Sequence, residues 1–376
     1  TTMPKKPKDV IIVGAGIVGC LTGYLLAKEG VQVTIIEKDS VASHASVFAF
    51  GEMGALEGTG IPDPLLDFSL WSNRKHKQLY EELKETSGID SHFRIGDRLT
   101  LSFDDSSAEH AKRNLEWQSP IPDFDTYWVD SKQARDIEPR VNPEALGGVL
   151  VKGAGSTEPY RYTLAAAQAG EKMGVTMILR NVTGLISSQG VCTGVKFDGG
   201  ELNSESVVLA MGPWANVASE WCKFEIPISP LKGQILRLNL PGDPLKCSIH
   251  YGGSYLGSKP DGLVWAGTTE EEAGFDEQIT PEGRNKVMED LLQMAPSLNV
   301  SELVHQTACL RPVSSDGLPV IGKVPGWNNV YLGTGAGRKG ILWSTGMSYG
   351  LKDIILGNPA EVPGLAFLDP IRFVTA

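Results

Sequence analysis

Three glycines and a glutamate near the start of the chain have the spacing of a dinucleotide-binding site. Gly14, Gly16 and Gly19 follow one apolar run, and Glu37 ends the next. Gly14 would allow a tight turn, Gly16 would let backbone amides approach a pyrophosphate, and Gly19 would let a helix pack close to the first strand. The Glu37 carboxylate can accept hydrogen bonds from both ribose hydroxyls and disfavours a 2′-phosphate. The spacing therefore predicts a site for FAD or NAD rather than NADP.

Arg311 is the first candidate for binding a carboxylate. It stands in the segment Leu310-Arg311-Pro312. The planar guanidinium fork suits a bidentate hold on a carboxylate group. A structural salt bridge is the alternative interpretation.

A second glycine loop, Gly335 to Gly340, carries Arg338 and Lys339 and leads into a long apolar segment. Three glycines in six positions before a helix exceed what flexibility alone requires, which indicates a functional loop. Positive potential at a helix start would favour an anionic group. Arg338 is either a ligand-binding residue or an exposed loop arginine.

The elements that would position these residues form a mixed α/β pattern. Residues 207–212 are apolar throughout, which is typical of a strand buried on both faces of a parallel sheet. Between residues 227 and 269, short alternating segments separated by turn residues indicate antiparallel strands. Helices are expected at 16–29, 69–86, 130–136, 163–173, 281–295 and 340–355. Strands are expected at 9–13, 31–37, 98–103, 176–179, 182–187, 191–198, 207–212, 233–240, 254–258, 263–268 and 330–333.

The order of these elements predicts two domains. A chain of 376 residues can bury two sizeable cores. Dinucleotide-binding segments lie at both ends and in the middle, so we expect one domain from residues 1–90, 145–215 and 305–376. Residues 91–144 and 216–304 would build the second domain.

Composition excludes several function classes. Lys and Arg number 34 against 45 Asp and Glu, a net charge of −11 without basic runs, which argues against nucleic acid as a partner. The 5 cysteines are scattered and indicate neither a disulfide framework nor a metal site. A reducing, cytoplasmic location follows. The apolar run after the first lysines fits the glycine motif better than a signal peptide, and no segment is long enough to span a membrane.

Five segments together resemble the family of D-amino-acid oxidase, glycine oxidase and sarcosine oxidase. They are the glycine motif with Glu37, then 155–159 (GSTEP), 207–214 (VVLAMGPW) with 230–234 (PLKGQ), 310–322 (LRPVSSDGLPVIG) and 335–341. The resemblance implies an α/β fold with a glutathione-reductase-type FAD-binding Rossmann domain. It also implies a second, α+β substrate domain built on an antiparallel sheet. The implied cofactor is FAD.

The glycine motif and the resemblance together assign the FAD contacts to the turns and loops after the strands. The expected cofactor-binding residues are Gly14, Gly16, Ile17, Val18, Glu37, Lys38, Ser43, His44, Ala45, Ser46, Gly51, Met53, Val182, Ala210, Gly212, Trp214, Arg311, Gly337, Arg338, Lys339, Gly340 and Ile341.

The family chemistry is oxidation of an amine carbon, in which a hydride passes to the flavin and the imine hydrolyses. The resemblance makes Arg311, Tyr255 and Arg338 the expected catalytic residues, with Arg311 holding the substrate carboxylate. Tyr255 fits the family's substrate-contacting tyrosine better than Tyr251 does. Because the flavin carries out the difficult step, no dedicated base is required. His44 could serve as one, although a supporting or surface role is commoner.

The resemblance leaves the electron acceptor open. Sarcosine oxidases carry an oxygen-activating lysine in the strand that here reads 262–267, and this chain has Trp265 near that place. Oxygen, giving hydrogen peroxide, is the favoured acceptor. A dehydrogenase of proline-like or hydroxyproline-like substrates using another acceptor is the first alternative. A flavin-bearing subunit without turnover is the second.

Cys309 lies where monomeric sarcosine oxidase bonds FAD covalently, but a small buried residue is the favoured interpretation. The expected partner is a small amino-acid or amine substrate, and a homo-oligomer is left open.

Overall fold

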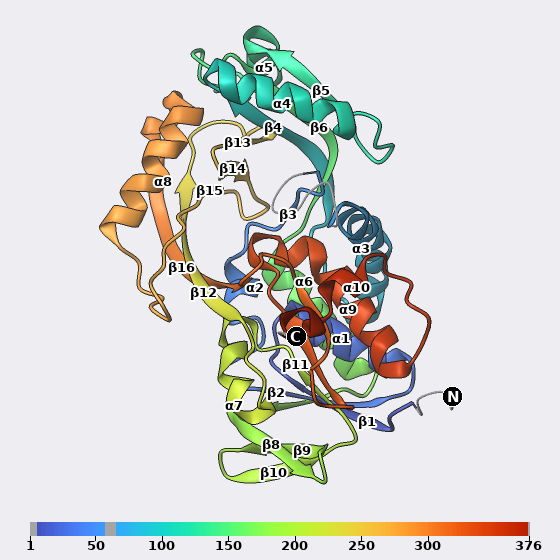
Figure 1. Cartoon of the computed structure of the whole chain (residues 1–376). Helices are drawn as coiled ribbons and strands as arrows, with labels where there is room; N and C mark the ends of the chain where they lie inside the picture. The colour runs from blue at the N-terminus through green and yellow to red at the C-terminus, as the bar shows by residue number, and fades with distance from the viewer. Residues whose placement is uncertain (1–5, 57–64, 375–376) are drawn as a thin grey trace. The chain divides into compact units, whose positions relative to one another are not determined.

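A computed structural model describes residues 6–56 and 65–374. Its backbone contacts divide the chain into two compact units (Figure 1). Unit 1 comprises Thr1–Phe93, Thr157–Leu231 and Leu310–Ala376. Unit 2 comprises Arg94–Ser156 and Lys232–Cys309. Each unit is therefore assembled from segments that lie far apart in the sequence.

Unit 1 is built on a six-stranded sheet in the order β17-β18-β11-β1-β2-β7. All neighbours are parallel except β17 and β18. Its strands are β1 (Asp9–Val13), β2 (Gln32–Glu37), β7 (Thr176–Leu179), β11 (Val207–Leu209), β17 (Val320–Lys323) and β18 (Val330–Thr334). The apolar run at 207–212 thus supplies the buried central strand β11, as its composition predicts.

Helices of unit 1 pack against one another beside this sheet. Helix α1 packs against α6 and α9, and α3 packs against α9. The helices are α1 (Ile17–Lys28), α2 (Ala45–Phe48), α3 (Leu65–Ser87), α6 (Pro159–Lys172), α7 (Ser219–Cys222), α9 (Gly340–Leu356) and α10 (Leu365–Leu368). Short 3₁₀ helices lie at Gly212–Ala218 (η1), Gly337–Lys339 (η3) and Pro370–Phe373 (η4). A three-stranded sheet of β8 (Val182–Ser188), β9 (Val191–Phe197) and β10 (Gly200–Asn203), and the short β3 (Glu52–Met53), complete the unit.

Polar side chains are buried between these helices, among them Ser72, His76 and Ser344. The His76 ring on α3 lies 5.6 Å from the Tyr162 ring on α6. Its Nε2 lies 2.9 Å from the carbonyl oxygen of Leu342 on α9. Because a carbonyl can only accept, Nε2 carries the proton. Burial lowers the pKa of His76 to about 4, so the ring is neutral.

Unit 2 is built on a large sheet with the strand order β16-β12-β15-β14-β13-β4-β6, and β5 also pairs with β6. The β12, β15, β14 and β13 neighbours are antiparallel, as the alternating pattern predicts, whereas β13 and β4 are parallel. The strands are β4 (Arg94–Ser102), β5 (Asp125–Asp130), β6 (Gly147–Ser156), β12 (Ile228–Asn239), β13 (Ser248–Tyr251), β14 (Ser254–Ser258), β15 (Val264–Gly267) and β16 (Glu302–Ser314). Strands β12 and β16 cross the boundary, because residues 228–231 and 310–314 belong to unit 1. The helices are α4 (Asp105–Gln118), α5 (Ser131–Ile137), α8 (Pro281–Met294) and the 3₁₀ turn η2 (Pro296–Val300).

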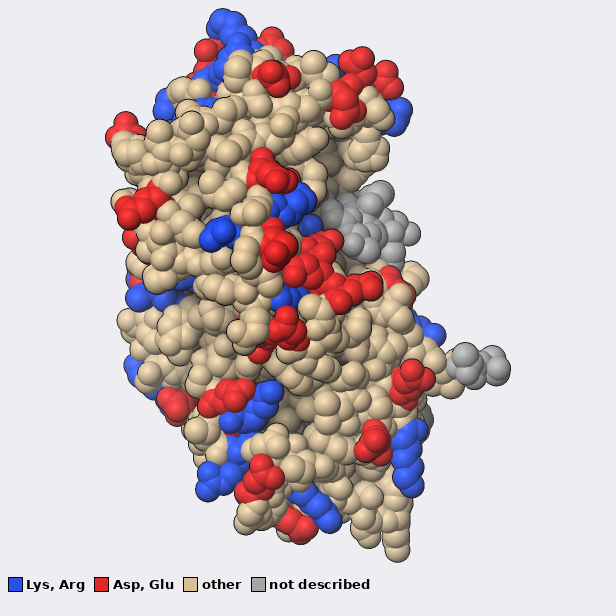
Figure 2. Space-filling view, turned by 90° about the vertical axis from the view of Figure 1, so that its left-hand side faces the viewer, with Lys and Arg blue, Asp and Glu red and all other residues tan. Residues whose placement is uncertain are grey.

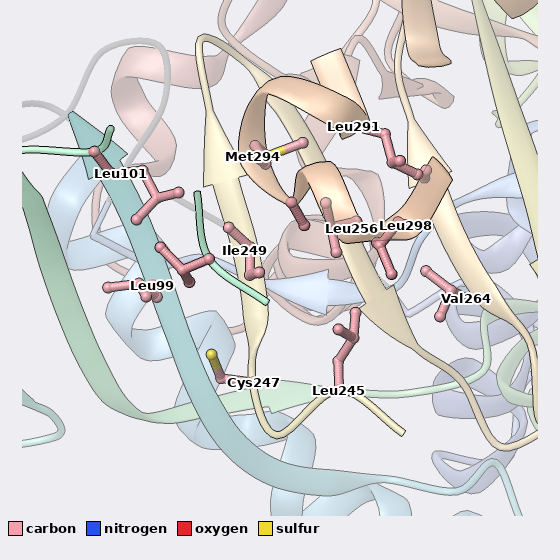
Figure 3. Packing of buried hydrophobic residues seen from close by; sticks show 14 of the residues in the cluster. Leu99, Leu101, Leu245, Cys247, Ile249, Leu256, Val264, Leu291, Met294 and Leu298 are labelled. Carbon is pink, nitrogen blue, oxygen red and sulfur yellow. The ribbon is translucent and has the colours of Figure 1, made fainter. Parts of the chain in front are cut away.

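One face of this sheet forms the core of unit 2 (Figure 3). Leu99, Ile249 and Leu256 project from β4, β13 and β14 toward Leu291 and Met294 of α8. Side chains alternate along each strand, so the residues between these apolar positions lie on the opposite face. That opposite face carries Tyr255 and is described below.

The observed units differ from the predicted domains mainly at two segments. Residues 147–156, predicted in the FAD-binding domain, form β6 and pair with β4 and β5 of unit 2. Residues 216–231, predicted in the substrate domain, contribute Ala218, Cys222 and Ile226 to the core of unit 1. Which segments serve the cofactor and which serve the substrate stays a prediction.

Several elements were not expected from the sequence. Helix α4 is one, because only Ala108 and Gln118 of its side chains are buried and its apolar periodicity is weak. The signal that marks it is Asp104, whose side chain accepts a hydrogen bond from the Ser107 amide at the helix start. Strand β6 is another, because its glycines resemble a loop.

On the side of the molecule that Figure 2 displays, the described Lys and Arg side chains lie interspersed with Asp and Glu side chains. No helix within the described residues is long and apolar enough to cross a membrane.

Candidate active site

The predicted cofactor residues of unit 1 gather at the carboxyl ends of its parallel strands. Gly14 follows β1, has φ +109°, and a Cβ placed on it would lie 2.2 Å from the Ala210 carbonyl oxygen after β11. A Cβ on Gly19 would lie 2.0 Å from the Gly14 carbonyl oxygen. Both positions therefore exclude any side chain, and the turn and helix can approach only because they are glycines. The carboxyl edge of a parallel sheet is where doubly wound folds bind ligands.

Gly16 precedes the first residue of α1, where the chain packs closely against Ser46. A Cβ on Gly16 would meet only the Ser46 hydroxyl, at 3.3 Å. The Ile17 amide donates a hydrogen bond to the same hydroxyl oxygen, at 3.1 Å. The remaining amides of the first turn of α1, the Val18 amide among them, provide the donors and the positive potential that a pyrophosphate needs.

Glu37 is fixed by two backbone amides. Its Oε2 accepts from the Ala15 amide at 2.7 Å, and its Oε1 accepts from the Asp39 amide at 2.9 Å. Each carboxylate oxygen can accept a further hydrogen bond. The carboxylate is thus oriented at the end of β2 with capacity for the two ribose hydroxyls.

Lys38, His44 and Trp214 form a cluster beside Glu37. The Lys38 Nζ lies 4.0 Å from the centre of the Trp214 ring, and the His44 ring lies 4.5 Å from that ring. The His44 Nε2 lies 2.7 Å from Oδ2 of Asp39. The hydrogen bond from His44 lowers the pKa of the Asp39 carboxyl. Sequence reasoning missed Asp39, although its position two residues after Glu37 was a usable signal.

The second glycine loop lies at the same edge of the sheet, after β18. The Thr334 hydroxyl donates to the Gly212 carbonyl at 2.9 Å. Gly212 and Gly337 have φ of +53° and +52°, and a Cβ on either would meet nothing within 4 Å. The Lys339 ammonium donates to the carbonyl of Gly54, which follows β3. Gly340 and Ile341 begin α9 directly after this loop.

The loop after β2 is held to α6. A Cβ on Gly51, which has φ +85°, would lie 2.3 Å from the Thr157 carbonyl oxygen. Met53 is buried next to it. Ala45 and Ser46 lie on the short helix α2, and Ser43 precedes them. Val182 buries its side chain in the core of unit 1, so only its backbone is available to a cofactor.

Arg311 is a buried cation on β16, with 9% of its surface exposed. An isolated pairing joins its strand to the second glycine loop, because Val313 and Ala336 form a β-bridge. Arg338, on η3 in that loop, is exposed. The structure therefore connects the Arg311 strand and the Arg338 loop within unit 1.

Tyr255 belongs to unit 2, on β14. It pairs with Gly267 of β15 and with His250 of β13 on the sheet face opposite the core. Tyr251 points to the other face, where its ring lies 4.8 Å from that of Phe103. This difference supports the choice of Tyr255 over Tyr251.

The cysteines are all buried, and none forms a disulfide. Cys309 is among them, with 6% of its surface exposed. Among the residues that the structure describes, no group of three His, Cys, Asp or Glu side chains could hold a metal ion.

Comparison with known proteins identifies the family. A family model for FAD dependent oxidoreductases (DAO) matches residues 9–353. The chain belongs to this family. Glycine oxidase of Bacillus licheniformis is 26% identical over 357 residues, which cover 95% of each chain. Glycine oxidase of Geobacillus kaustophilus is 28% identical over 340 residues, or 89% of each chain.

The crystal structure of the Geobacillus kaustophilus enzyme resembles this FAD-dependent oxidoreductase with a TM-score of 0.93 at 25% identity. The match covers 99% of this chain and 100% of that chain. The predicted fold class, the membership of the oxidase family and the FAD cofactor are therefore confirmed. The glycine turn before α1, the oriented Glu37 and the amides at the start of α1 fit that cofactor. The roles of the individual residues stay predictions.

Proposed function

We propose that this FAD-dependent oxidoreductase oxidises the C–N bond of a small amino acid or secondary amine to an imine. The observation that carries the proposal is the buried Arg311, on a strand bridged to the glycine loop that opens α9. The guanidinium of Arg311 is a planar fork of N–H donors that matches the two oxygens of a carboxylate. The similarity to glycine oxidases supports a substrate carboxylate as its ligand.

The residues of the chain would act by binding the substrate and orienting it. A bound flavin would supply the acceptor for the hydride that leaves the substrate α-carbon. Arg311 would hold the substrate carboxylate through two parallel hydrogen bonds, which fixes the rotation of the α-carbon. The Tyr255 hydroxyl and Arg338 would provide further polar contacts to the substrate. The amine must enter as the neutral base, because its lone pair forms the imine bond as the hydride leaves.

The experiment is an anaerobic substrate screen of the purified holoenzyme. Glycine, sarcosine, D- and L-amino acids and prolines are mixed with the protein while the flavin absorbance is recorded. Bleaching by at least one carboxylate-bearing amine is expected. If none of these amines bleaches a flavin that dithionite does reduce, the proposal is overturned, and a flavin-bearing subunit without turnover becomes the better interpretation.

Oxygen is the proposed electron acceptor, which takes two electrons and two protons to give hydrogen peroxide. A dehydrogenase is the second candidate, favoured by Trp265, which is buried on β15 where sarcosine oxidases carry a lysine. Admitting oxygen to the bleached enzyme separates the two. Reoxidation within the turnover time supports an oxidase, and reoxidation far slower than turnover with an artificial acceptor supports a dehydrogenase.

A further inference from the structure

An arginine near the C-terminus holds the turn between β16 and β17. Arg372, on η4, donates from Nε to Asp316 Oδ2 at 2.7 Å and from Nη2 to Asp316 Oδ1 at 3.2 Å. The same Nη2 lies within hydrogen-bond distance of the carbonyl oxygens of Leu318 and Pro319, at 3.1 and 3.0 Å. One guanidinium therefore contacts three residues of the segment 314–319, here called the 314–319 turn.

The other side of the Arg372 guanidinium is anchored in the C-terminal segment. Its Nη1 donates to the carbonyl oxygen of Leu368, the last residue of α10, at 2.6 Å. The segment itself packs closely on β17, because a Cβ placed on Gly322 would lie 2.7 Å from Cδ of Pro370. Only 17% of the Arg372 side chain is exposed, so the pair with Asp316 is partly shielded and its two parallel hydrogen bonds fix its geometry.

The 314–319 turn also has hydrogen bonds of its own. Oδ1 of Asp316 accepts from the Leu318 amide at 3.0 Å. The Ser314 hydroxyl donates to the Leu318 carbonyl at 2.6 Å, and the Gly317 amide donates to the Ser314 carbonyl at 3.0 Å. A displacement of Asp316 would therefore move the turn as a whole.

The turn lies against the second glycine loop. A Cβ placed on Gly335 would lie 3.5 Å from the Leu318 carbonyl oxygen, to which Arg372 donates. The next residue, Ala336, forms a β-bridge with Val313, which directly precedes the turn. The loop that opens α9 is thus in contact both with the turn and with the strand that enters it.

That strand carries Arg311. It lies on β16 three residues before Ser314, at the start of the turn. Because Pro312 restricts the backbone directly after Arg311, a displacement of the turn is passed on to the arginine. All of these residues belong to unit 1. The contacts that begin at Arg372 therefore end at Arg311 and at the loop of Arg338.

We propose that Arg372 is a positioning residue for the candidate active site, which fixes the Arg311 strand and the Arg338 loop through the 314–319 turn. This inference rests on the proposed function, in which Arg311 binds the substrate carboxylate. Loss of the Arg372 guanidinium should weaken carboxylate binding and leave the glycine turn at residues 14–19 as it is.

Hydrogen exchange of the holoenzyme tests the structural part without turnover. In Arg372→Ala, amides of residues 314–319 and 335–340 should exchange at least about tenfold faster than in the wild type, since a hydrogen bond to a charged group is worth that much. Amides of residues 14–19 should exchange as in the wild type. Faster exchange at all three segments would show that Arg372 only supports the fold. Unchanged exchange at 335–340 would overturn the inference.

Binding of acetate, which is glycine without its amine, tests the functional part. Acetate is titrated into the holoenzyme while the flavin difference spectrum is recorded. Arg372→Ala should weaken acetate binding by about tenfold or more, because a misplacement by about 1 Å can cost this much. The dissociation constant of FAD should change by less than about twofold. An equal weakening of FAD binding would contradict a positioning role.

Asp316→Asn should have the same effect, because it removes the charge and the second oxygen from the pair while keeping an acceptor for the Leu318 amide. The double variant of Arg372 and Asp316 should bind acetate no more weakly than either single variant, since both changes remove one contact. Additive losses would show that the two residues act separately and would overturn the inference.

Lys323→Ala is the matched control, because it removes a cation from the exposed end of β17, the strand that follows the turn. It should leave exchange and acetate affinity as in the wild type. Arg372→Lys keeps the charge without the parallel donors, so it should recover little of the affinity. Full recovery by lysine, or a loss in Lys323→Ala, would attribute the effect to charge alone and overturn the inference.

Steady-state kinetics separates this inference from the proposed function. Arg372→Ala should raise KM for carboxylate-bearing amines by about tenfold. An amine that bleaches the wild-type flavin and has the same KM in Arg372→Ala overturns only this inference. If no amine bleaches the wild-type flavin, the proposed function is overturned and this inference with it.

Discussion

The Tyr255 phenol lies across the backbone of Gly267. A Cβ placed on Gly267 would come within 2.6 Å of the Tyr255 hydroxyl oxygen and 2.7 Å of the ring carbon that bears it. The two residues are directly opposite on β14 and β15. The absence of a side chain at position 267 therefore determines where the Tyr255 hydroxyl can lie.

Gly267→Ala should displace that hydroxyl while the Tyr255 side chain itself is unchanged. If Tyr255 contacts the substrate, we expect kcat/KM to fall roughly tenfold or more, since misplacing a contact by about 1 Å can cost this much. Tyr255→Phe should produce a similar loss. Gly96→Ala on β4 is the control, because a Cβ there meets nothing within 4 Å. Unchanged kinetics in Gly267→Ala would remove Tyr255 from the site.

Arg311→Ala should weaken the use of carboxylate substrates selectively. A hydrogen bond to a charged group contributes about 1.5–3 kcal/mol, so kcat/KM should fall about 10- to 150-fold. The matched substrate is the amine in which a methyl group replaces the carboxylate, and its kcat/KM should hardly change. Flavin content and melting temperature are measured alongside. An equal loss for both substrates would indicate a structural role.

Gly14→Ala should abolish flavin retention, whereas Gly30→Ala should not. Both glycines have positive φ, +109° and +76°, so alanine is strained at either position. Only at Gly14 would the new Cβ collide with backbone, 2.2 Å from the Ala210 oxygen, since Gly30 has nothing within 4 Å. The strain alone costs about 1–3 kcal/mol. Flavin absorbance per protein and urea unfolding measure the two effects, and equal behaviour of the variants would contradict the prediction.

His76 should make the stability of unit 1 fall on acidification. The folded protein holds the pKa of His76 at about 4, against about 6.5 in the unfolded chain. Between these two values the unfolded chain binds more protons than the folded protein does. The contribution of His76 to the free energy of unfolding is therefore fully present above about pH 6.5 and is lost as the pH falls toward 4. The decrease should be on the order of 3 kcal/mol.

Urea unfolding at pH 5, 6 and 7.5 measures this slope. His76→Gln should reduce the pH dependence, because the Gln side chain can donate to the Leu342 carbonyl without titrating. His110→Gln, on the exposed surface of α4, should leave the slope as in the wild type. If His76→Gln leaves the pH dependence of the free energy of unfolding unchanged, this pH dependence does not come from His76.

The parts of the fold that follow from local constraints could be predicted from the sequence. β1, α1 and β2 are one such part, because Gly14 and Gly19 occupy places that no side chain can enter. The parallel strand β11 is another, since burial on both faces requires an uninterrupted apolar run.

Tertiary pairing decides the rest. Strand β6 contains glycines that are typical of a loop, yet a Cβ on Gly148 would lie 2.5 Å from the Thr100 carbonyl oxygen on the neighbouring strand β4. The glycine there permits close strand approach, which no local pattern indicates. The contact of Lys38 with Trp214 cannot be predicted from the sequence either, because the two residues come from distant segments.

The order of strands in unit 1 has a consequence for biosynthesis. Strand β1 lies beside β11, which lies beside β18. During synthesis the glycine turn after β1 is therefore made before all of unit 2, whereas β18 is made after it. A product that stops before β18 cannot complete the sheet that presents this turn. We therefore expect a product truncated before β18 to lose the flavin, so that yellow colour in a preparation would separate intact protein from truncated protein before any assay is run.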